Sequence, residues 1–274
     1  MKKTVKLLCL VLALVMALAF CACGKTDKDV PASDSDVKPS AAPASDSDIA
    51  GFTTIEDGKL IMSLNASFPP YESTDDNGDI VGIDIDIAKA IADKLGLELV
   101  IDDMDFDAAL LAVQQGKSDI AMSGISITDQ RLTVMDFSDP YTTAVQSILV
   151  KEGSDVNLDN LGEHLIGTVR GYTGNMYCVD DYGEDHVVAY DDGAALVLAL
   201  MNDQVDCVVV DDEPARAYAA ANPGLVVLDT EYAVEEYAIG FTKGNDALNN
   251  AVNDALNELI ADGTVKAIID SFIG

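Results

Sequence analysis

The stretch that decides the fold is Ser123-Gly-Ile-Ser-Ile-Thr-Asp-Gln-Arg-Leu-Thr-Val-Met-Asp-Phe-Ser-Asp-Pro-Tyr141. A short buried strand is predicted just before it, over Asp119–Met122, and Thr128 is a good N-cap for a helix that follows. The loop Ser123–Ile127 is therefore predicted to lie between a strand end and a helix N-terminus. Backbone N–H groups collect at such a position and bind anions.

Side chains in this stretch favour the binding of one small carboxylate. Gly124 lets a ligand approach the backbone closely, Ser126 adds a hydroxyl to the loop that begins at Ser123, and Arg131 places a guanidinium fork in the first helical turn. Spacing alone leaves a second interpretation open, in which Arg131 belongs to a capped surface helix and is merely solvated.

The same stretch resembles the signature of the bacterial extracellular solute-binding proteins, family 3, which serve ABC importers of amino acids and include glutamine- and histidine-binding proteins. Their signature reads roughly Gly-Ile-Ser/Thr-Ile-Thr-x-x-Arg, followed by Asp-Phe-Ser-x-x-Tyr, and here it runs from Gly124 to Tyr141. The similarity extends from about Lys59 to the C-terminus. It implies an α/β, two-lobed periplasmic-binding-protein fold (type II), in which each lobe is a mostly parallel sheet flanked by helices and two strands form the hinge.

The resemblance also implies how the chain divides. Residues 55–145 and 239–274 are expected to form lobe 1, and residues 146–238 to form lobe 2. The chain is expected to cross between the lobes near Val145–Leu149 and near Tyr237–Phe241. Two final helices, Asp246–Ala261 and Thr264–Phe272, would then return to lobe 1.

Strands and helices are predicted to alternate along the chain, which favours parallel sheets with ligand groups at the carboxyl ends of strands. The pattern begins with a strand at Lys59–Leu64 and starts again at Ile166–Val169, which is followed by a loop, Arg170–Gly174. Asp107 is expected to cap a helix that ends before Gly116. The other predicted elements are a helix at Asp84–Leu95, a strand at Leu97–Ile101, a strand at His186–Tyr190, a helix at Ala194–Met201, a strand at Val205–Val210 and a helix with Pro214 in its first turn.

Composition excludes some classes of function. The 274-residue chain has a net charge of −32 and a pI near 4.1, so the phosphates of a nucleic acid would be repelled. His164, His186 and the scattered cysteines show no metal-ligand spacing. We therefore expect no nucleic-acid partner and no metal site, and the resemblance implies neither a cofactor nor a catalytic residue. Whether Cys178 and Cys207 form a disulfide is left open by the sequence.

The N-terminus has the pattern of a lipoprotein. Residues 1–22 are predicted to be a signal peptide, because early lysines precede a short apolar run from Val5 through Phe20. Bacterial lipoprotein signals resemble this segment, and Ala22 fits the small residue before the lipidated cysteine, which makes Cys23 the expected anchor. Residues 23–54, rich in Asp, Ser, Pro and Ala, would be the anchor and a disordered linker. Plain secretion without a lipid is the alternative.

An amino-acid ligand carries a carboxylate and an ammonium group, and burying either of them without an opposite charge from the protein is costly. Arg131 and the Ser123–Ser126 loop would hold the carboxylate. By resemblance, Asp211 would hold the ammonium, with Asp212 and Glu213 as neighbours that could take its place. The family's ligand-facing aromatic residues and its lobe-2 threonine correspond to Phe68, Phe106 and Thr173.

Arg170 is expected to determine which amino acid binds. It stands at the start of a lobe-2 loop, where it would offer donors to a side-chain oxygen and oppose a cation. The predicted ligand is therefore a polar amino acid of the glutamine or glutamate class. The alternative is that Arg170 only pairs with a surface acid.

The predicted function is a monomeric, lipid-anchored, extracytoplasmic protein that captures a free amino acid by cleft closure and delivers it to the membrane subunits of an ABC importer. Binding would shift an open–closed equilibrium. Three alternatives remain: a cyclohexadienyl-dehydratase-like enzyme on the same fold, for which Glu213 is the one candidate acid; an amino-acid sensor without a transport role; and a structural surface protein.

Overall fold

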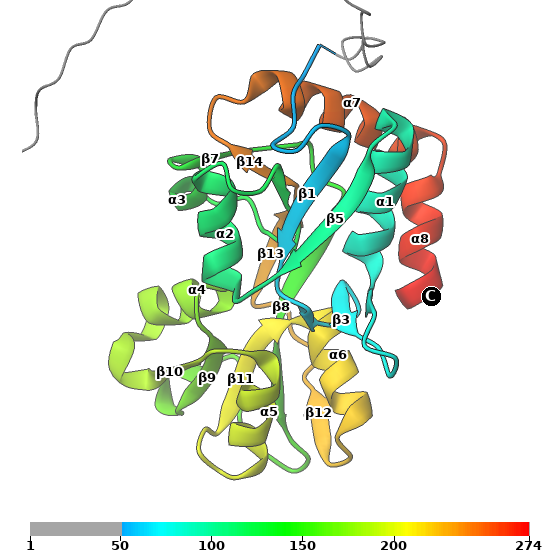
Figure 1. Ribbon diagram of the computed structural model, residues 1–274. Coiled ribbons are helices and arrows are strands. Elements are labelled where there is room, and N and C mark those ends of the chain that lie inside the picture. Colours follow the sequence, from blue (N-terminus) through cyan, green and yellow to red (C-terminus); the bar gives the residue numbers. More distant parts are fainter. Residues whose placement is uncertain (1–50, 274) are drawn as a thin grey trace, which may run out of the picture. The chain divides into compact units, whose positions relative to one another are not determined.

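Two mixed β-sheets organise the part of the chain that the structure, a computed structural model, describes: residues 51–273 (Figure 1). The predicted signal peptide and Cys23 lie outside these residues. The first sheet has the order β5-β1-β6-β14-β7, and we call it and its helices lobe 1. Its strands are β5 (Glu98–Asp103), β1 (Lys59–Leu64), β6 (Ile120–Ala121), β14 (Gly240–Thr242) and β7 (Met135–Phe137).

Lobe 1 is built on β1, whose sequence is apolar on both faces. Leu60 through Leu64 are all buried, as expected for a strand that pairs in parallel with β5 and β6 and is covered on both sides. Helix α2 (Phe106–Gln114) packs on β1, β6 and β14, whereas α1 (Ile83–Leu95) packs on β5 and against α7 (Asp246–Ala261) and α8 (Thr264–Ile273). The last two helices therefore pack on lobe 1, the lobe to which the resemblance implies that they return.

The boundaries of α1 follow from its two flanking glycines. Gly96 takes the left-handed conformation at the C-cap, with φ of 70°, as predicted for the residue that ends the helix. Gly82 precedes the helix, and a Cβ placed there would lie 2.0 Å from the Tyr71 carbonyl oxygen, so only glycine fits. Asp84 and Asp86 lie in the first turn, at the positive end of the helix dipole.

Lobe 2 contains the second sheet, with the order β10-β9-β11-β8-β12 and β13 paired to β8. Its parallel part consists of β10 (Val187–Tyr190), β9 (Ile166–Val169) and β11 (Cys207–Asp211). Antiparallel pairing adds β8 (Thr142–Lys151), β12 (Leu225–Val227) and β13 (Ala233–Tyr237). Its helices are α4 (Thr173–Tyr182), α5 (Gly193–Met201) and α6 (Asp212–Ala221), with short 3-10 turns at Leu161–Glu163 and Glu184–His186.

The fold class is confirmed: the molecule has the two-lobed α/β fold, with sheets that are parallel in three strands each and antiparallel beyond them. Cys178 and Cys207 are buried free thiols, and burial raises the pKa of each to about 12. Such thiols are almost wholly protonated and unreactive near neutral pH.

Two adjacent segments connect the lobes. One is Ser138–Tyr141, between β7 and β8, and the other is Ala238–Ile239, between β13 and β14. They are hydrogen-bonded to each other: Ser138 N donates to Ile239 O over 3.0 Å and Tyr141 N donates to Tyr237 O over 2.9 Å. The second connection lies within the predicted crossing Tyr237–Phe241, whereas the first lies before the predicted crossing Val145–Leu149. Val145–Leu149 lies inside β8, because that strand already pairs with β13 from Thr142 onward.

Three local predictions need correction or extension. Helix α2 begins at Phe106 with Asp105 at its N-cap, so Asp107 lies in the first turn and does not cap. No local pattern predicted the small sheet formed by β2 (Ser67–Phe68), β3 (Glu72–Thr74) and β4 (Ile80–Val81). Helix α3 (Asp129–Leu132) is a single turn, and its predicted cap is present: Thr128 Oγ1 accepts from Arg131 N at 3.1 Å.

Candidate ligand-binding site

The loops that carry the predicted site follow parallel strands, whose carboxyl ends lie at one edge of each sheet. In lobe 1 these strands are β1, β5 and β6, and in lobe 2 they are β9 and β11. The two edges contact each other directly: Arg131 Nη2 donates to Gly171 O over 3.1 Å, and Tyr218 OH donates to Ser67 O over 3.2 Å. The site therefore lies between the lobes, at the strand ends where α/β sheets bind ligands.

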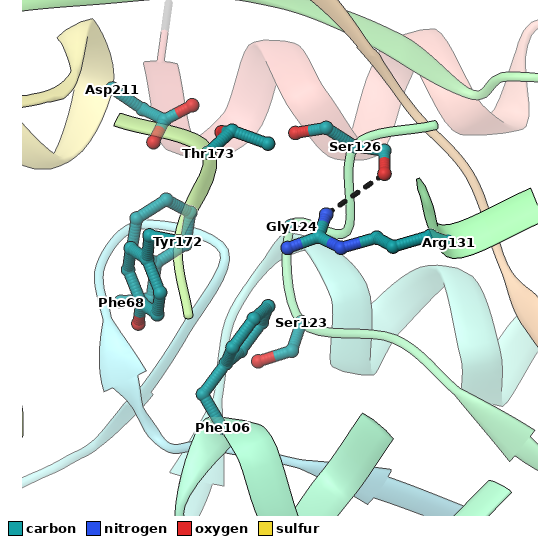
Figure 2. A pocket seen from close by; sticks show the side chains of 9 residues that line it. All are labelled: Phe68, Phe106, Ser123, Gly124, Ser126, Arg131, Tyr172, Thr173 and Asp211. Atoms are coloured by element: carbon teal, nitrogen blue, oxygen red, sulfur yellow. Dashed lines mark hydrogen bonds between the residues drawn. The ribbon is translucent and has the colours of Figure 1, made fainter. Parts of the chain in front are cut away.

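Nine residues line a small pocket there, and eight of them are residues that the sequence predicted (Figure 2). The ninth is Tyr172. The cavity that remains among them is about 10 Å³, the room needed by about one water molecule. The lining residues are Phe68, Phe106, Ser123, Gly124, Ser126, Arg131, Tyr172, Thr173 and Asp211.

Arg131 is buried, with 6% of its surface exposed, which excludes the solvated-arginine interpretation. Its Nη1 donates to Ser126 O over 2.8 Å, and the centre of its guanidinium lies 5.4 Å from the Phe106 ring centroid. Burial lowers the pKa of Arg131, against the opposing charges of Glu235 and Asp211. A guanidinium stays charged at neutral pH, so a buried cation faces the pocket.

Asp211 ends β11 and stands at the N-cap position of α6, with 3% of its surface exposed. Its carboxylate accepts a hydrogen bond from the Tyr237 hydroxyl. Burial, followed by the charge of Glu235, raises the pKa of Asp211 to about 7. Among the three consecutive acids, Asp211 is the one that lines the pocket; Asp212 and Glu213 lie in the first turn of α6, near Arg216.

Aromatic rings form one wall of the pocket. The Tyr172 ring meets Phe68 edge-on, with 5.3 Å between centroids, and Phe106 at 4.6 Å. Tyr172 belongs to lobe 2 and both phenylalanines belong to lobe 1, so these contacts join the lobes. Tyr172 was not predicted, and its position beside Thr173 in the loop after β9 is the one indirect signal that points to it.

The loop Ser123–Gly124 is held by buried acids behind it. Ser123 Oγ donates to Glu72 Oε1 over 2.6 Å, and Gly124 N donates to Asp84 Oδ2 over 2.9 Å. Burial raises the pKa of Glu72 well above its ordinary value and that of Asp84 to about 6. These two donors are engaged within the protein, so they hold the loop rather than lie open to a ligand carboxylate.

Gly124 has a steric role in the pocket. Its φ is +54°, and a Cβ at this position would lie 2.5 Å from Cε1 of Phe68. The backbone at Gly124 therefore lies against the aromatic wall, and the close approach predicted for a ligand is made here by a side chain of the protein.

Sequence reasoning missed a buried acid, Glu235. Three groups donate to its Oε2: Ser126 Oγ over 3.2 Å, Thr173 Oγ1 over 2.9 Å and Gln146 Nε2 over 2.9 Å. Glu235 lies on β13 and Gln146 on β8, the two strands that adjoin the hinge. The available signal was the pair Glu235-Glu236 in a strand, because alternate residues face opposite sides and one of the two had to point inward.

Arg170 is not part of the pocket. Its side chain is 58% exposed, and its Nε donates to Asp191 Oδ1 over 3.3 Å while Nη2 donates to Ala189 O over 3.2 Å. It lines a separate, open groove on the other side of Phe106. Asp191, which directly follows β10, forms an ion pair with Arg170 outside the pocket. The alternative interpretation, in which Arg170 only pairs with a surface acid, therefore describes this residue.

Residues 51–273 contain no cluster of histidine, cysteine and acidic residues suited to a metal ion. None of the helices in this part of the chain is long and apolar enough to cross a membrane.

Two apposed α/β lobes, joined by paired hinge segments and enclosing a pocket with a buried cation and a buried acid, define a cleft-type solute-binding protein. The chain matches the model of the bacterial extracellular solute-binding proteins, family 3, over residues 60–274, and it belongs to that family. Members of this family bind solutes for transport and are not enzymes, so the predicted absence of enzymatic activity is confirmed on this ground.

Named relatives span most of the chain. A probable histidine-binding protein from Neisseria gonorrhoeae is 32% identical over 86% of this chain and 85% of its own. The ABC transporter glutamine-binding protein GlnH of Bacillus subtilis is 31% identical, covering 100% of this chain and 98% of its own. Among solved structures, an ancestral arginine-binding protein bound to glutamine has a TM-score of 0.76 and 37% identity, covering 80% and 99%.

Proposed function

We propose that this protein captures a free amino acid between its lobes and presents it to the membrane subunits of an ABC importer. The observation that carries the proposal is that a buried guanidinium and a buried carboxylate line the same pocket between the lobes. Arg131 comes from lobe 1 and Asp211 from lobe 2. An amino-acid zwitterion supplies the counter-charge to each, and neither protein charge is then left unpaired.

Within this proposal the residues take separate roles. Arg131, with the loop around Ser126, receives the ligand carboxylate, and Asp211 receives the ammonium. Phe68 and Phe106 pack against the ligand's carbon chain. Thr173 reaches the ligand from lobe 2, so that contacts from both lobes are made together only in the closed form and binding favours closure.

Transport is supported by the relatives, whose names describe binding proteins of ABC transporters for glutamine and other amino acids. The same proposal includes lipidation at Cys23, which would keep the protein at the outer surface of the cell membrane. It also includes a monomeric protein whose chain passes between the lobes at Ser138–Tyr141 and at Ala238–Ile239.

The predicted preference for glutamine or glutamate depended on Arg170. Since the structure pairs Arg170 with Asp191 outside the pocket, no contact now supports a preference for a side-chain acceptor. The relatives are named for histidine, arginine and glutamine, so a polar amino acid remains the proposed ligand.

The test is a melting-temperature screen against the twenty amino acids, followed by calorimetry of those that stabilise. Ligand at a hundredfold excess over Kd contributes about 2.7 kcal/mol to the free energy of unfolding, which shifts the melting temperature measurably. A chain that no amino acid stabilises would contradict the proposal. Turnover of an added acid in the same mixtures would favour the enzyme alternative.

A further inference from the structure

Two buried carboxyl groups lie directly behind the loop that carries the pocket. Glu72 belongs to β3 and Asp84 to the first turn of α1, and neither residue has any exposed surface. Each receives a hydrogen bond from one of two consecutive residues that line the pocket (Figure 2): Ser123 Oγ donates to Glu72 and Gly124 N donates to Asp84. The position of this loop therefore depends on the two acids.

The carboxyl groups of Glu72 and Asp84 approach each other to hydrogen-bonding distance. Within residues 51–273, neither forms an ion pair with a lysine, an arginine or a histidine. The titratable groups that face the pair from the surrounding elements are another acid and tyrosines, namely Asp103 of β5, Tyr71, Tyr141, Tyr172 and Tyr218. Two buried carboxylates without a cation repel each other, so one of them has to hold a proton.

The hydrogen-bond pattern distinguishes the two acids. Asp84 accepts at both oxygens, from Gly124 N at Oδ2 and from Tyr141 OH at Oδ1 over 2.8 Å, as an ionised carboxylate does. Glu72 accepts at Oε1, and its Oε2 is buried without a donor among the described residues. A proton on Glu72 makes this group a donor to Asp84 and leaves no buried carboxyl oxygen unmatched.

The donors on the other side of Glu72 are oriented in the same way. Asn65 N donates to Ser123 Oγ over 3.1 Å, and Ser123 Oγ donates onward to Glu72 Oε1 over 2.6 Å. Donors therefore follow one another from Asn65 through Ser123 and Glu72 to Asp84. Loss of the proton from Glu72 interrupts this chain and puts two negative charges side by side, which drives the acids, and with them Ser123 and Gly124, apart.

We propose that a proton held by Glu72 and shared with Asp84 positions the Ser123–Gly124 loop for binding, and that affinity for the ligand falls when this proton is lost at alkaline pH. The effect on affinity rests on the proposed function. Both acids are positioning residues, because they hold the loop and neither lines the pocket. Asp211 has the opposite requirement, since it has to be ionised to bind an ammonium, so affinity should pass through a maximum as pH rises.

The first experiment compares urea unfolding of the unmodified protein and of Glu72→Gln, without ligand. The amide of glutamine donates to Asp84 and accepts from Ser123 as a protonated Glu72 does, but at every pH. The folded chain keeps a proton that the unfolded chain has released, so the unmodified protein loses stability as pH rises. Relative to the variant, its equilibrium constant for unfolding should increase by about tenfold per pH unit between about pH 6 and about pH 8.

The matched control for unfolding is Glu152→Gln, the same change in the exposed turn after β8. This variant should follow the unmodified protein at every pH. If Glu72→Gln does the same, the pair holds no additional proton in the folded chain and the inference is wrong.

The second experiment measures affinity for a bound amino acid by calorimetry from about pH 7 to about pH 10. Near pH 7, Glu72→Gln should bind within about twofold of the unmodified protein. Toward pH 10 the unmodified protein should become weaker than the variant by about tenfold or more, the factor for one hydrogen bond to a charged group. The ligand's ammonium also loses its proton in this range, equally for both proteins, so the ratio of the two affinities is the measurement. A ratio that stays constant would overturn the inference.

Asp84→Asn tests which acid carries the proton. Asparagine has one carbonyl oxygen for two donors, Gly124 N and Tyr141 OH, so this variant should bind at least about tenfold more weakly at every pH. Normal binding by Asp84→Asn, with the loss of affinity at alkaline pH removed, would place the proton on Asp84 and contradict the assignment to Glu72.

Infrared spectroscopy of the unmodified protein needs neither a variant nor a ligand. At about pH 8, above the pKa of Asp211 at about 7, the carbonyl band of one protonated carboxyl group should remain. Absence of this band would overturn the inference even if Glu72→Gln does not fold. If no amino acid binds, the proposed function fails, whereas the infrared band and the unfolding comparison still decide whether the pair holds a proton.

Discussion

Arg131 takes part in two kinds of contact, one with the pocket and one between the lobes. It faces the pocket as a buried cation, and it also donates to the Gly171 carbonyl of the opposite lobe. The second contact is made by the protein alone, so Arg131 contributes to closure as well as to ligand binding. A ligand carboxylate would share this guanidinium with two backbone carbonyls, those of Ser126 and Gly171.

Arg131→Ala should leave the protein folded and remove amino-acid binding. Truncating one partner of a desolvated charge pair costs roughly 2–5 kcal/mol, whereas micromolar affinity corresponds to about 8 kcal/mol in total. Calorimetry should therefore show at least about a thirtyfold loss of affinity. Micromolar binding that survives in the variant, with an unchanged circular dichroism spectrum, would exclude this role for Arg131.

Asp211 should make affinity and stability depend on pH in opposite directions. Its pKa is raised to about 7, above the ordinary value near 4, so between these values the folded chain holds a proton that the unfolded chain has released. Through this group, the free energy of unfolding without ligand increases as pH falls from about 7. Affinity for the amino acid decreases over the same range, because a protonated Asp211 cannot pair with an ammonium.

The measurement is calorimetry and thermal unfolding from pH 8 to pH 5, with Asp211→Asn as the control. That variant should bind weakly at every pH and lose most of the pH dependence of affinity. Buried Asp84, with a pKa raised to about 6, changes stability in the same direction, so some pH dependence of unfolding should remain. Affinity that rises as the pH falls would contradict the assignment.

At the scale of the element, the loop after β9 decides how much room a ligand has. Tyr172 in this loop packs on Phe68 and Phe106, and 7% of the residue's surface is exposed. The remaining cavity, about 10 Å³, is far smaller than any amino acid. Tyr172 therefore has to move, or the lobes have to part, before a ligand is bound.

Tyr172→Ala should increase affinity for the ligand by roughly tenfold. The substitution removes a ring that competes for the space between the phenylalanines, and aromatic pairs of this kind contribute about 0.5–1.5 kcal/mol beyond their buried area. Tyr172→Phe keeps the ring and should bind like the unmodified protein. Weaker binding by the alanine variant would show that the ring packs on the ligand and does not compete with it.

At the scale of the whole molecule, the folded unit and its attachment should be independent. The structure describes residues 51–273, and the site lies wholly within them, between the two lobes. Lipidation is predicted at Cys23, outside this unit. Changing the anchor should therefore leave the ligand-binding equilibrium as it is.

Cys23→Ser should release the protein from membranes with its amino-acid affinity unchanged within about twofold, because every residue of the site belongs to the folded unit and Cys23 does not. Membrane pelleting and calorimetry measure the two properties separately. Cys21→Ser is the matched control and should stay membrane-bound. A variant Cys23→Ser that pellets as before, or a mature N-terminus without lipid in the mass spectrum, would refute the prediction.

The sequence by itself determined the elements and most of the pocket. Strand β1, helix α1 and the loop Ser123–Ile127 follow from local patterns of apolar residues, caps and glycines. Because parallel strands bring their carboxyl ends to one edge, the loops after these strands had to meet, and eight of the nine pocket residues could be predicted.

Only the tertiary structure decided which charges face the ligand. Arg170 and Glu235 look alike in sequence, as charged residues beside a strand end and within a strand, yet the first pairs with Asp191 at the rim and the second is buried. Glu235 meets Ser126, 109 residues away along the chain, because the loop of Ser126 is hydrogen-bonded to the end of β13: Ile127 N donates to Glu236 O over 3.0 Å. No local pattern encodes such a contact, because the direction of a side chain in a sheet depends on strand register, and register is set by the whole fold.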